Sequence, residues 1–371
     1  MGRTPAALIA MACSVGLLLV ACGNNRLPEP DPGAAARGPG GPRVGVILPD
    51  TATSARWAHF DQPMLQAALR QEGLTPIVQN AQGDAQKFAQ IADGMLSQRV
   101  QVLIIAAPSG DAGATVEQKA EQQGVPVIDY DRLNVGGSAD YYVSFDHEMV
   151  GELQARALAA ALRDKPGAQV IEVGGASTDH NATLVHSGQS EELGPRYAAG
   201  DLRLASSRFV DGWDNQAGGQ VFEQLLTANG GRVDGVLAAN DGLAAAVITV
   251  LQKYGLAGAV PVTGQDMTVD GLRAILQGYQ SSTVFKPIRE EAAVAAKVAA
   301  ALVRGDVAAA DALADERTPD PVAGREVKSV LLAPQLITRE DIKSVLGPGN
   351  VRADEICGGE LAGACRQLGI A

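Results

Sequence analysis

The chain has 371 residues, a formal net charge of −12 and 46% hydrophobic residues, which is ordinary for a soluble protein and long enough for two domains or one large one. Its acidic residues are dispersed, and it has no cluster of Lys and Arg of the kind that binds nucleic acid, so we exclude a nucleic-acid partner.

Residues 1–21 have the pattern of an export signal. Arg3 is followed by an uncharged apolar run over residues 6–20, which is short for a transmembrane helix. The run ends in LVAC at residues 19–22, which resembles a bacterial lipobox and predicts that Cys22 carries acyl chains such as palmitate. Stable anchoring to a membrane takes more than one acyl chain. The alternative is a plain signal peptide followed by an incidental cysteine.

Residues 22–42 are rich in proline and glycine and have almost no large apolar side chains. Such a segment cannot build a core, so we expect a disordered tether between the lipidated cysteine and a globular part that starts at Arg43.

Two cysteines, Cys357 and Cys365, lie close together in an expected C-terminal extension over residues 347–371. Outside the cytoplasm such neighbours usually pair, which predicts a disulfide, with two free thiols as the alternative. A metal site would need more ligands, and no histidine lies nearby, so we expect no metal and no cofactor.

From residue 43 onward, short apolar runs alternate with amphipathic segments such as 148–162 and 216–226. Apolar strands separated by helices are typical of parallel sheets covered on both faces. The expected strands cover residues 44–48, 75–79, 102–106, 125–129, 142–145, 169–173, 202–209, 233–238, 260–263, 282–285 and 327–332. One ordinary sheet would not hold them all, so we predict an α/β chain with two doubly wound, Rossmann-like lobes.

Polar and aromatic residues follow nearly every expected strand. Ligands of doubly wound sheets bind beyond the carboxyl ends of the strands, so we expect these residues to converge on one site. A single charged residue in such a place is often only a helix cap or a turn residue, and this interpretation fits Asp211 and Asp241. The recurrence of Asp, Asn and Arg from both halves of the chain favours a binding site.

These residue types suit a sugar, whose hydroxyl groups both donate and accept hydrogen bonds. Carboxylates accept, amides do both, and Arg and Lys donate. Aromatic rings pack against the C–H patches of a sugar ring. The chain has only two tryptophans, Trp57 and Trp213, and both follow strand ends, one in each predicted lobe. We therefore predict that they flank a sugar ring, although a core position is the alternative for each.

Several short segments, taken in order and spacing, resemble one family. They are 56–57 (RW), 130–132 (YDR), 142–146 (YVSFD), 150–155 (VGELQA), 179–182 (DHNA), 210–213 (VDGW), 239–241 (AND), 264–266 (GQD) and 283–287 (TVFKP). Over about residues 43–332 the chain resembles type I periplasmic sugar-binding proteins, in particular their D-xylose-binding branch. The resemblance implies an extracytoplasmic lipoprotein that delivers a monosaccharide, D-xylose or a related pentose, to the permease of an ABC-type importer.

The resemblance also implies which residues contact the sugar. They are Arg56, Trp57, Asp131, Arg132, Asp146, Asp179, His180, Asn181, Trp213, Asn240, Asp266 and Lys286. The branch has Asn-Asn where this chain has His180-Asn181, and residues 50–55 also depart from it, so the sugar stays open.

An interleaved architecture follows from the same resemblance. We expect the chain to cross between lobes near Asp146, at 264–266 and at 284–286. The first lobe would comprise residues 43–146 and 267–284, and the second residues 147–265 and 285–346.

Three other functions are alternatives for such a chain. An enzyme is not expected, because the chain has no Gly-Lys-Ser/Thr loop, no His-Glu-x-x-His and no Gly-x-Ser-x-Gly. A sugar-responsive transcription factor would need a basic helix-turn-helix module before the first strand. The signal and the tether occupy that part of the chain, so we do not expect this function. A binding protein for a hexose or an autoinducer sugar, feeding a transporter or a membrane sensor, remains the main alternative. We expect a monomer that is anchored to the cell membrane by its lipid.

Overall fold

A computed structural model describes residues 41–51, 54 and 56–370. The predicted signal peptide and Cys22 lie outside the described residues. None of the helices in the described part is both long and apolar enough to span a membrane.

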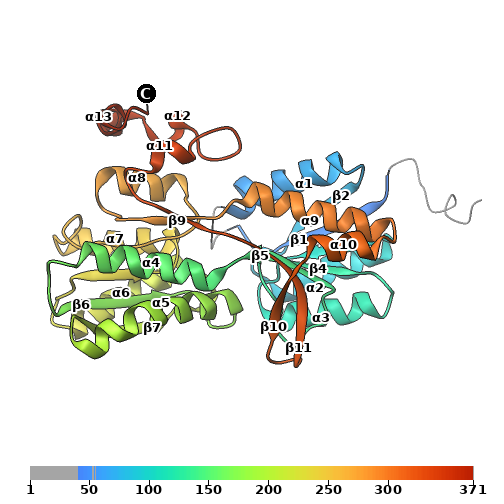
Figure 1. Cartoon of the computed structure of the whole chain (residues 1–371), viewed down its shortest axis with the longest axis horizontal. Helices are drawn as coiled ribbons and strands as arrows, with labels where there is room; N and C mark the ends of the chain where they lie inside the picture. Colours follow the sequence, from blue (N-terminus) through green and yellow to red (C-terminus); the bar gives the residue numbers. More distant parts are fainter. Residues whose placement is uncertain (1–40, 52–53, 55, 371) are drawn as a thin grey trace, which may run out of the picture. The chain divides into compact units, whose positions relative to one another are not determined.

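The first lobe is built on a seven-stranded sheet in the order β10-β11-β5-β4-β3-β1-β2 (Figure 1). All neighbours are parallel except β10 and β11. The strands are β1 (Arg43–Leu48), β2 (Thr75–Asn80), β3 (Val102–Ile105), β4 (Val127–Tyr130), β5 (Tyr141–Phe145), β10 (Glu316–Asp320) and β11 (Arg325–Leu332). β3, β4 and β5 are buried along their whole length, as the apolar runs in the sequence indicate.

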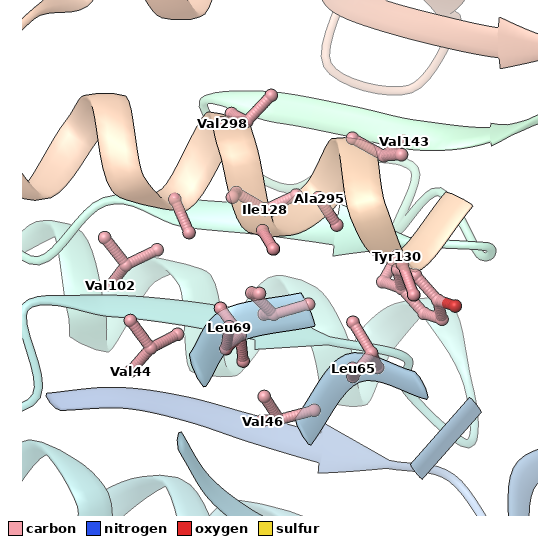
Figure 2. Close-up of a cluster of buried hydrophobic side chains, with 14 of the residues drawn as sticks. Val44, Val46, Leu65, Leu69, Val102, Ile128, Tyr130, Val143, Ala295 and Val298 are labelled. Carbon is pink, nitrogen blue, oxygen red and sulfur yellow. The ribbon is translucent and has the colours of Figure 1, made fainter. Parts of the chain in front are cut away.

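Helices cover both faces of this sheet. One face packs against α1 (Gln62–Gln71) and α9 (Ile288–Val303), and Figure 2 shows Leu65 and Leu69 of α1 beside Ala295 of α9 in that core. The other face packs against α2 (Ala85–Ser97) and α3 (Gly110–Glu121). The side chains of Asp84 and Ser109 cap α2 and α3, which fixes where these helices begin.

The second lobe has a three-stranded parallel sheet in the order β7-β6-β8. Its strands are β6 (Ala168–Gly174), β7 (Leu202–Phe209) and β8 (Gly235–Ala238), and its helices are α4 (His147–Ala161), α5 (His180–Ala199), α6 (Asn215–Ala228), α7 (Asp241–Lys253) and α8 (Val269–Gln277). The strand expected at 260–263 is reduced to two isolated bridges, of Val262 with Val236 and of Val260 with Ala257.

The expected lobes of residues 267–332 are reversed in the structure. Helix α8 packs on α7 of the second lobe, whereas α9 packs on α1, β3 and β4 of the first, which is the reverse of the expectation. Asp241 holds the segments on either side of α8 in the second lobe, because its carboxylate accepts hydrogen bonds from the Thr268 backbone N–H and the Thr283 hydroxyl.

The structure therefore has no crossing between the lobes at residues 264–266, where one was expected. The chain crosses after β5 at Asp146, between β9 (Thr283–Phe285) and α9 at Lys286, and between β11 and β12 (Gln335–Ile337). β9 and β12 pair with each other as a separate antiparallel ribbon. The crossings near Asp146 and Lys286 match the sequence prediction.

The C-terminal segment belongs to the second lobe's core. It contains α11 (Ile342–Val345), α12 (Ala353–Ile356), the 3₁₀ turn η4 (Gly359–Leu361) and α13 (Ala362–Gln367). Ile342, Val351 and Ile356 form one buried cluster with Leu272 and Ile275 of α8. The Sγ atoms of Cys357 and Cys365 lie 2.08 Å apart, which closes the end of this segment.

Helices α4 and α5 cross in close contact because a glycine of each helix faces the backbone of the other helix. A Cβ on Gly188 of α5 would lie 2.0 Å from the carbonyl oxygen of Glu148, and a Cβ on Gly151 of α4 would lie 2.0 Å from that of Val185. No methyl group fits at either position unless the helices separate.

We predict that Gly188→Ala lowers the free energy of unfolding by about 1–3 kcal/mol, because it overpacks the crossing. Gly94→Ala in α2 is the matched control, since no atom lies within 4 Å of its added Cβ. The control should gain about 0.5–1 kcal/mol from reduced backbone entropy. Urea unfolding measures both, and equal effects of the two substitutions would contradict the packing argument.

Candidate functional site

A cavity lies between the two lobes, at the carboxyl ends of their strands. It is lined by Ser54, Arg56, Trp57, Asp131, Arg132, His147, Asp179, Asn181, Val185, Trp213, Asn240, Gln265, Asp266 and Lys286. The structure thus brings together every residue named from the sequence except Asp146 and His180. Ser54, His147, Val185 and Gln265 were not named.

Asp146 and His180 are each one position away from a lining residue. The Asp146 side chain caps α4 by accepting the N–H of Met149 at 2.8 Å, and His147 after it faces the cavity. His180 opens α5 between Asp179 and Asn181, both of which line the cavity. The sequence analysis selected both segments, but it could not tell which side chains in each one face the cavity.

The other unnamed residues had weaker sequence signals. Gln265 directly precedes Asp266 after an expected strand, and Val185 is one helical turn after Asn181, on the same face of α5. Ser54 lies in the segment that departs from the D-xylose-binding branch, and its hydroxyl donates to the Asp266 carboxylate at 2.9 Å.

Both tryptophans are held in fixed positions by their surroundings. Trp57 opens a short π-helical turn, and the Arg56 and Arg132 guanidinium carbons lie 4.6 Å and 5.3 Å from its ring centroid. The Trp213 indole N–H donates to Asp179 at 3.1 Å. A Cβ on Gly175 would lie 2.2 Å from the Trp213 ring, so only glycine leaves room for the indole.

The charged side chains of the cavity balance one another. Lys286 lies 3.2 Å from Asp266 and 3.6 Å from Asp131, and Arg56 donates to Asp131 at 2.5 Å. Arg132 of the first lobe lies 3.1 Å from Asp179 of the second. Three cations therefore face three carboxylates, and burial of such groups is tolerated only when they are paired. A neutral ligand preserves this balance, whereas a charged ligand disturbs it.

Four lining side chains have a buried polar atom with no hydrogen-bond partner among the described residues. They are the Trp57 indole nitrogen, the His147 Nδ1, the Gln265 Oε1 and the Asp266 Oδ1. An unpaired buried polar group costs about 1–3 kcal/mol, so these atoms can gain from a ligand that both donates and accepts.

Strained backbone conformations also gather here. Asp131, Trp213 and Asp266 have φ values of 62°, 55° and 93°, in the left-handed region that non-glycine residues rarely adopt. Such conformations persist where the surrounding structure enforces them, and they cluster at functional sites.

Two titratable groups of the cavity are shifted strongly. Burial alone would raise the pKa of Asp131, but attraction to Arg56 and Lys286 outweighs it and holds that pKa below its usual value. Burial and the ammonium of Lys286 lower the pKa of His147 to about 3, so its ring is neutral at physiological pH. In the part of the chain that the structure describes, no cluster of His, Cys, Asp or Glu could hold a metal ion.

We predict that His147 makes stability fall as the pH decreases from about 6.5 toward 3. The unfolded chain binds a proton on this residue below about pH 6.5, whereas the folded chain does not, at up to about 1.4 kcal/mol per pH unit. His147→Gln should remove this part of the pH dependence in urea unfolding. Burial raises the pKa of Asp241 to about 6, so this residue makes stability rise as the pH decreases. It is present in both the wild type and His147→Gln, so its effect cancels in the comparison. Identical pH profiles for the two proteins would contradict a buried neutral His147.

Comparisons with known proteins agree with this architecture. A family model described as a periplasmic binding protein domain matches residues 44–306. The D-xylose-binding periplasmic protein of Escherichia coli (strain K12) is 33% identical over 304 residues, which are 82% of this chain and 89% of that protein. A multiple sugar-binding periplasmic protein of Azospirillum brasilense is 34% identical over 315 residues, covering 80% of this chain and 85% of its own.

A solved structure matches both lobes. An ABC transporter solute-binding protein from Clostridium phytofermentans, with bound β-D-glucose, has a TM-score of 0.75 and 26% identity, covering 82% of this chain and 96% of its own. The two-lobed α/β fold, the matched domain and the relatives together show that the chain belongs to the type I periplasmic sugar-binding proteins, in their D-xylose-binding branch, a family of binding proteins and not of enzymes.

Proposed function

We propose that this chain captures a monosaccharide, D-xylose or a related pentose, outside the cytoplasm and delivers it to the permease of an ABC-type importer. The observation that carries the proposal is a cavity in which paired charges, two tryptophans and unpaired polar atoms converge from both lobes. Such a site offers a neutral polyol both donors and acceptors, and it offers the C–H faces of a ring two indoles.

Entry of a sugar requires contacts between the lobes to open. The cavity has a volume of about 30 Å³, far less than a ligand pocket of the usual size. The Arg132–Asp179 pair and the hydrogen bond from Asn181 to the Asp131 carbonyl oxygen at 2.8 Å both join one lobe to the other. We infer that these pairs exchange for sugar hydroxyls as the lobes open and close by hinge motion.

The relatives favour a pentose without excluding a hexose. Two similar proteins are described as D-xylose-binding and two as multiple sugar-binding, and two solved structures hold glucose. The difference at His180 has less weight for the choice, because that side chain does not line the cavity. Ser54 has more, because its hydroxyl meets Asp266 at the wall. A hexose or an autoinducer sugar, delivered to a transporter or a membrane sensor, is the second candidate.

We further propose that the protein is a monomer held at the membrane by lipid on Cys22, with Cys357 and Cys365 joined as a disulfide. The LVAC sequence at residues 19–22 supports the anchor, and the packing of Cys357 and Cys365 in one hydrophobic cluster supports the disulfide.

We predict that Arg132→Ala and Asp266→Ala each weaken sugar binding about tenfold to a hundredfold. Each removes a charged hydrogen-bonding partner, worth about 1.5–3 kcal/mol. His180→Asn is the matched control and should stay within about twofold of wild type. Isothermal titration calorimetry with D-xylose, D-ribose and D-glucose gives the affinities. Wild type that binds none of these or other monosaccharides, or variants with wild-type affinity, would refute the proposed site.

For the anchor, we predict that the protein expressed in its host fractionates with membranes and partitions into detergent, whereas Cys22→Ala does neither. Intact-mass analysis should find acyl chains on the wild type only. Recovery of the wild type as a secreted protein without lipid would overturn this part of the proposal.

A further inference from the structure

Behind the cavity wall, Arg56 is held by two carboxyl groups that do not line the cavity. Arg56 is 1% exposed, and Asp61 and Glu291 are fully buried. The Nε and Nη2 atoms of Arg56 donate to Asp61 at 2.9 Å and 2.6 Å, and Nη2 also donates to Glu291 at 2.9 Å. Only Nη1 is directed at a lining residue, Asp131.

The two carboxyl groups differ in their place in the chain. Asp61 is five residues after Arg56 and also accepts the Tyr130 hydroxyl at 2.9 Å, so it is part of the local core. Glu291 comes from α9, which begins directly after the crossing at Lys286. Its contact with Arg56 therefore fixes the guanidinium relative to a segment that carries another lining cation.

We propose that Glu291 is a positioning residue for ligand binding, which acts by holding the Arg56 guanidinium in the orientation that the cavity requires. This inference rests on the proposed function, because it assigns Arg56 a contact with the sugar. Glu291 itself does not line the cavity, so on this proposal its effect on affinity passes through Arg56.

The charges around Glu291 support a hydrogen-bonding role more than an ionic one. Asp61, Asp131 and Glu291 surround Arg56, with Lys286 as the next cation. Burial, together with repulsion from Asp131 and Asp61, raises the pKa of Glu291 well above its usual value despite the attraction to Arg56. Glutamine has the same shape and can accept the same hydrogen bond, so Glu291→Gln should preserve the function.

The simpler alternative is that Glu291 only joins α9 to the core. A double-mutant cycle separates the two roles, since residues that act through one another have non-additive effects. The variants are Glu291→Gln, Glu291→Leu, Arg56→Lys and the Arg56→Lys/Glu291→Leu double variant. Sugar affinity is measured by calorimetry on the full chain at a temperature at which circular dichroism shows each variant to be folded.

We expect Glu291→Gln to bind within about twofold of wild type and Glu291→Leu to lose about tenfold in affinity. The double variant should bind no more weakly than Arg56→Lys alone. If Glu291→Leu does not fold, Glu291→Asp replaces it in the cycle, because the shorter side chain withdraws the carboxyl group from Nη2 and should cause a similar coupled loss.

Glu117→Leu is the matched control. Glu117 is also fully buried in the first lobe, but it binds Asn134 and the backbone of Ser138, away from Arg56. Glu117→Leu should lower the melting temperature and leave the sugar affinity of the folded protein unchanged.

Wild-type affinity in Glu291→Leu, or losses that add in the double variant, would overturn the inference and leave the proposed function intact. An equal loss in Glu117→Leu would also overturn it, since general destabilisation would then explain the effect. A wild type that binds no sugar would instead overturn the proposed function, and this inference with it.

Discussion

The pairing of buried charges around Asp131 is the constraint on which the rest of the site depends. Asp131 stays ionised at its buried position because Arg56 and Lys286 lie beside it, and each of those cations has a second carboxylate partner. Removal of one member would leave an uncompensated buried charge, which is far more costly than a missing surface ion pair. The site must therefore be assembled as a unit from segments that are far apart in the sequence.

The fold delivers these segments by repeating one local device. A buried strand ends, a short polar side chain caps the next helix, and that capping residue lies at the lobe interface. Asp179 and Asn240 both cap helices and line the cavity, and Asp146 caps α4 so that His147 faces inward. Lys286, at a crossing between lobes, adds the charge that pairs with Asp131 and Asp266. The same residues thus both cap helices and line the cavity.

Sequence reasoning predicted the two α/β lobes from apolar runs that alternate with amphipathic segments, and the family resemblance named most of the lining residues, which follow strand ends where ligands of such sheets bind. It named Asp146 and His180, which do not line the cavity, because side-chain direction at a helix start depends on local dihedrals. It reversed the lobes of α8 and α9 because their places depend on tertiary contacts, such as those of Asp241 with Thr268 and Thr283, that have no pattern in the sequence. Nothing in the sequence indicates that Glu291 is buried, since a glutamate on an alanine-rich helix is usually exposed to solvent.

A crystal structure of the protein grown with D-xylose tests the central claim most directly. The account predicts electron density for the sugar between Trp57 and Trp213, with its hydroxyls within hydrogen-bond distance of Arg56, Arg132 and Asp266. Sugar bound anywhere else on the protein, or a sugar ring in the cavity with no contact to these charged side chains, would contradict it.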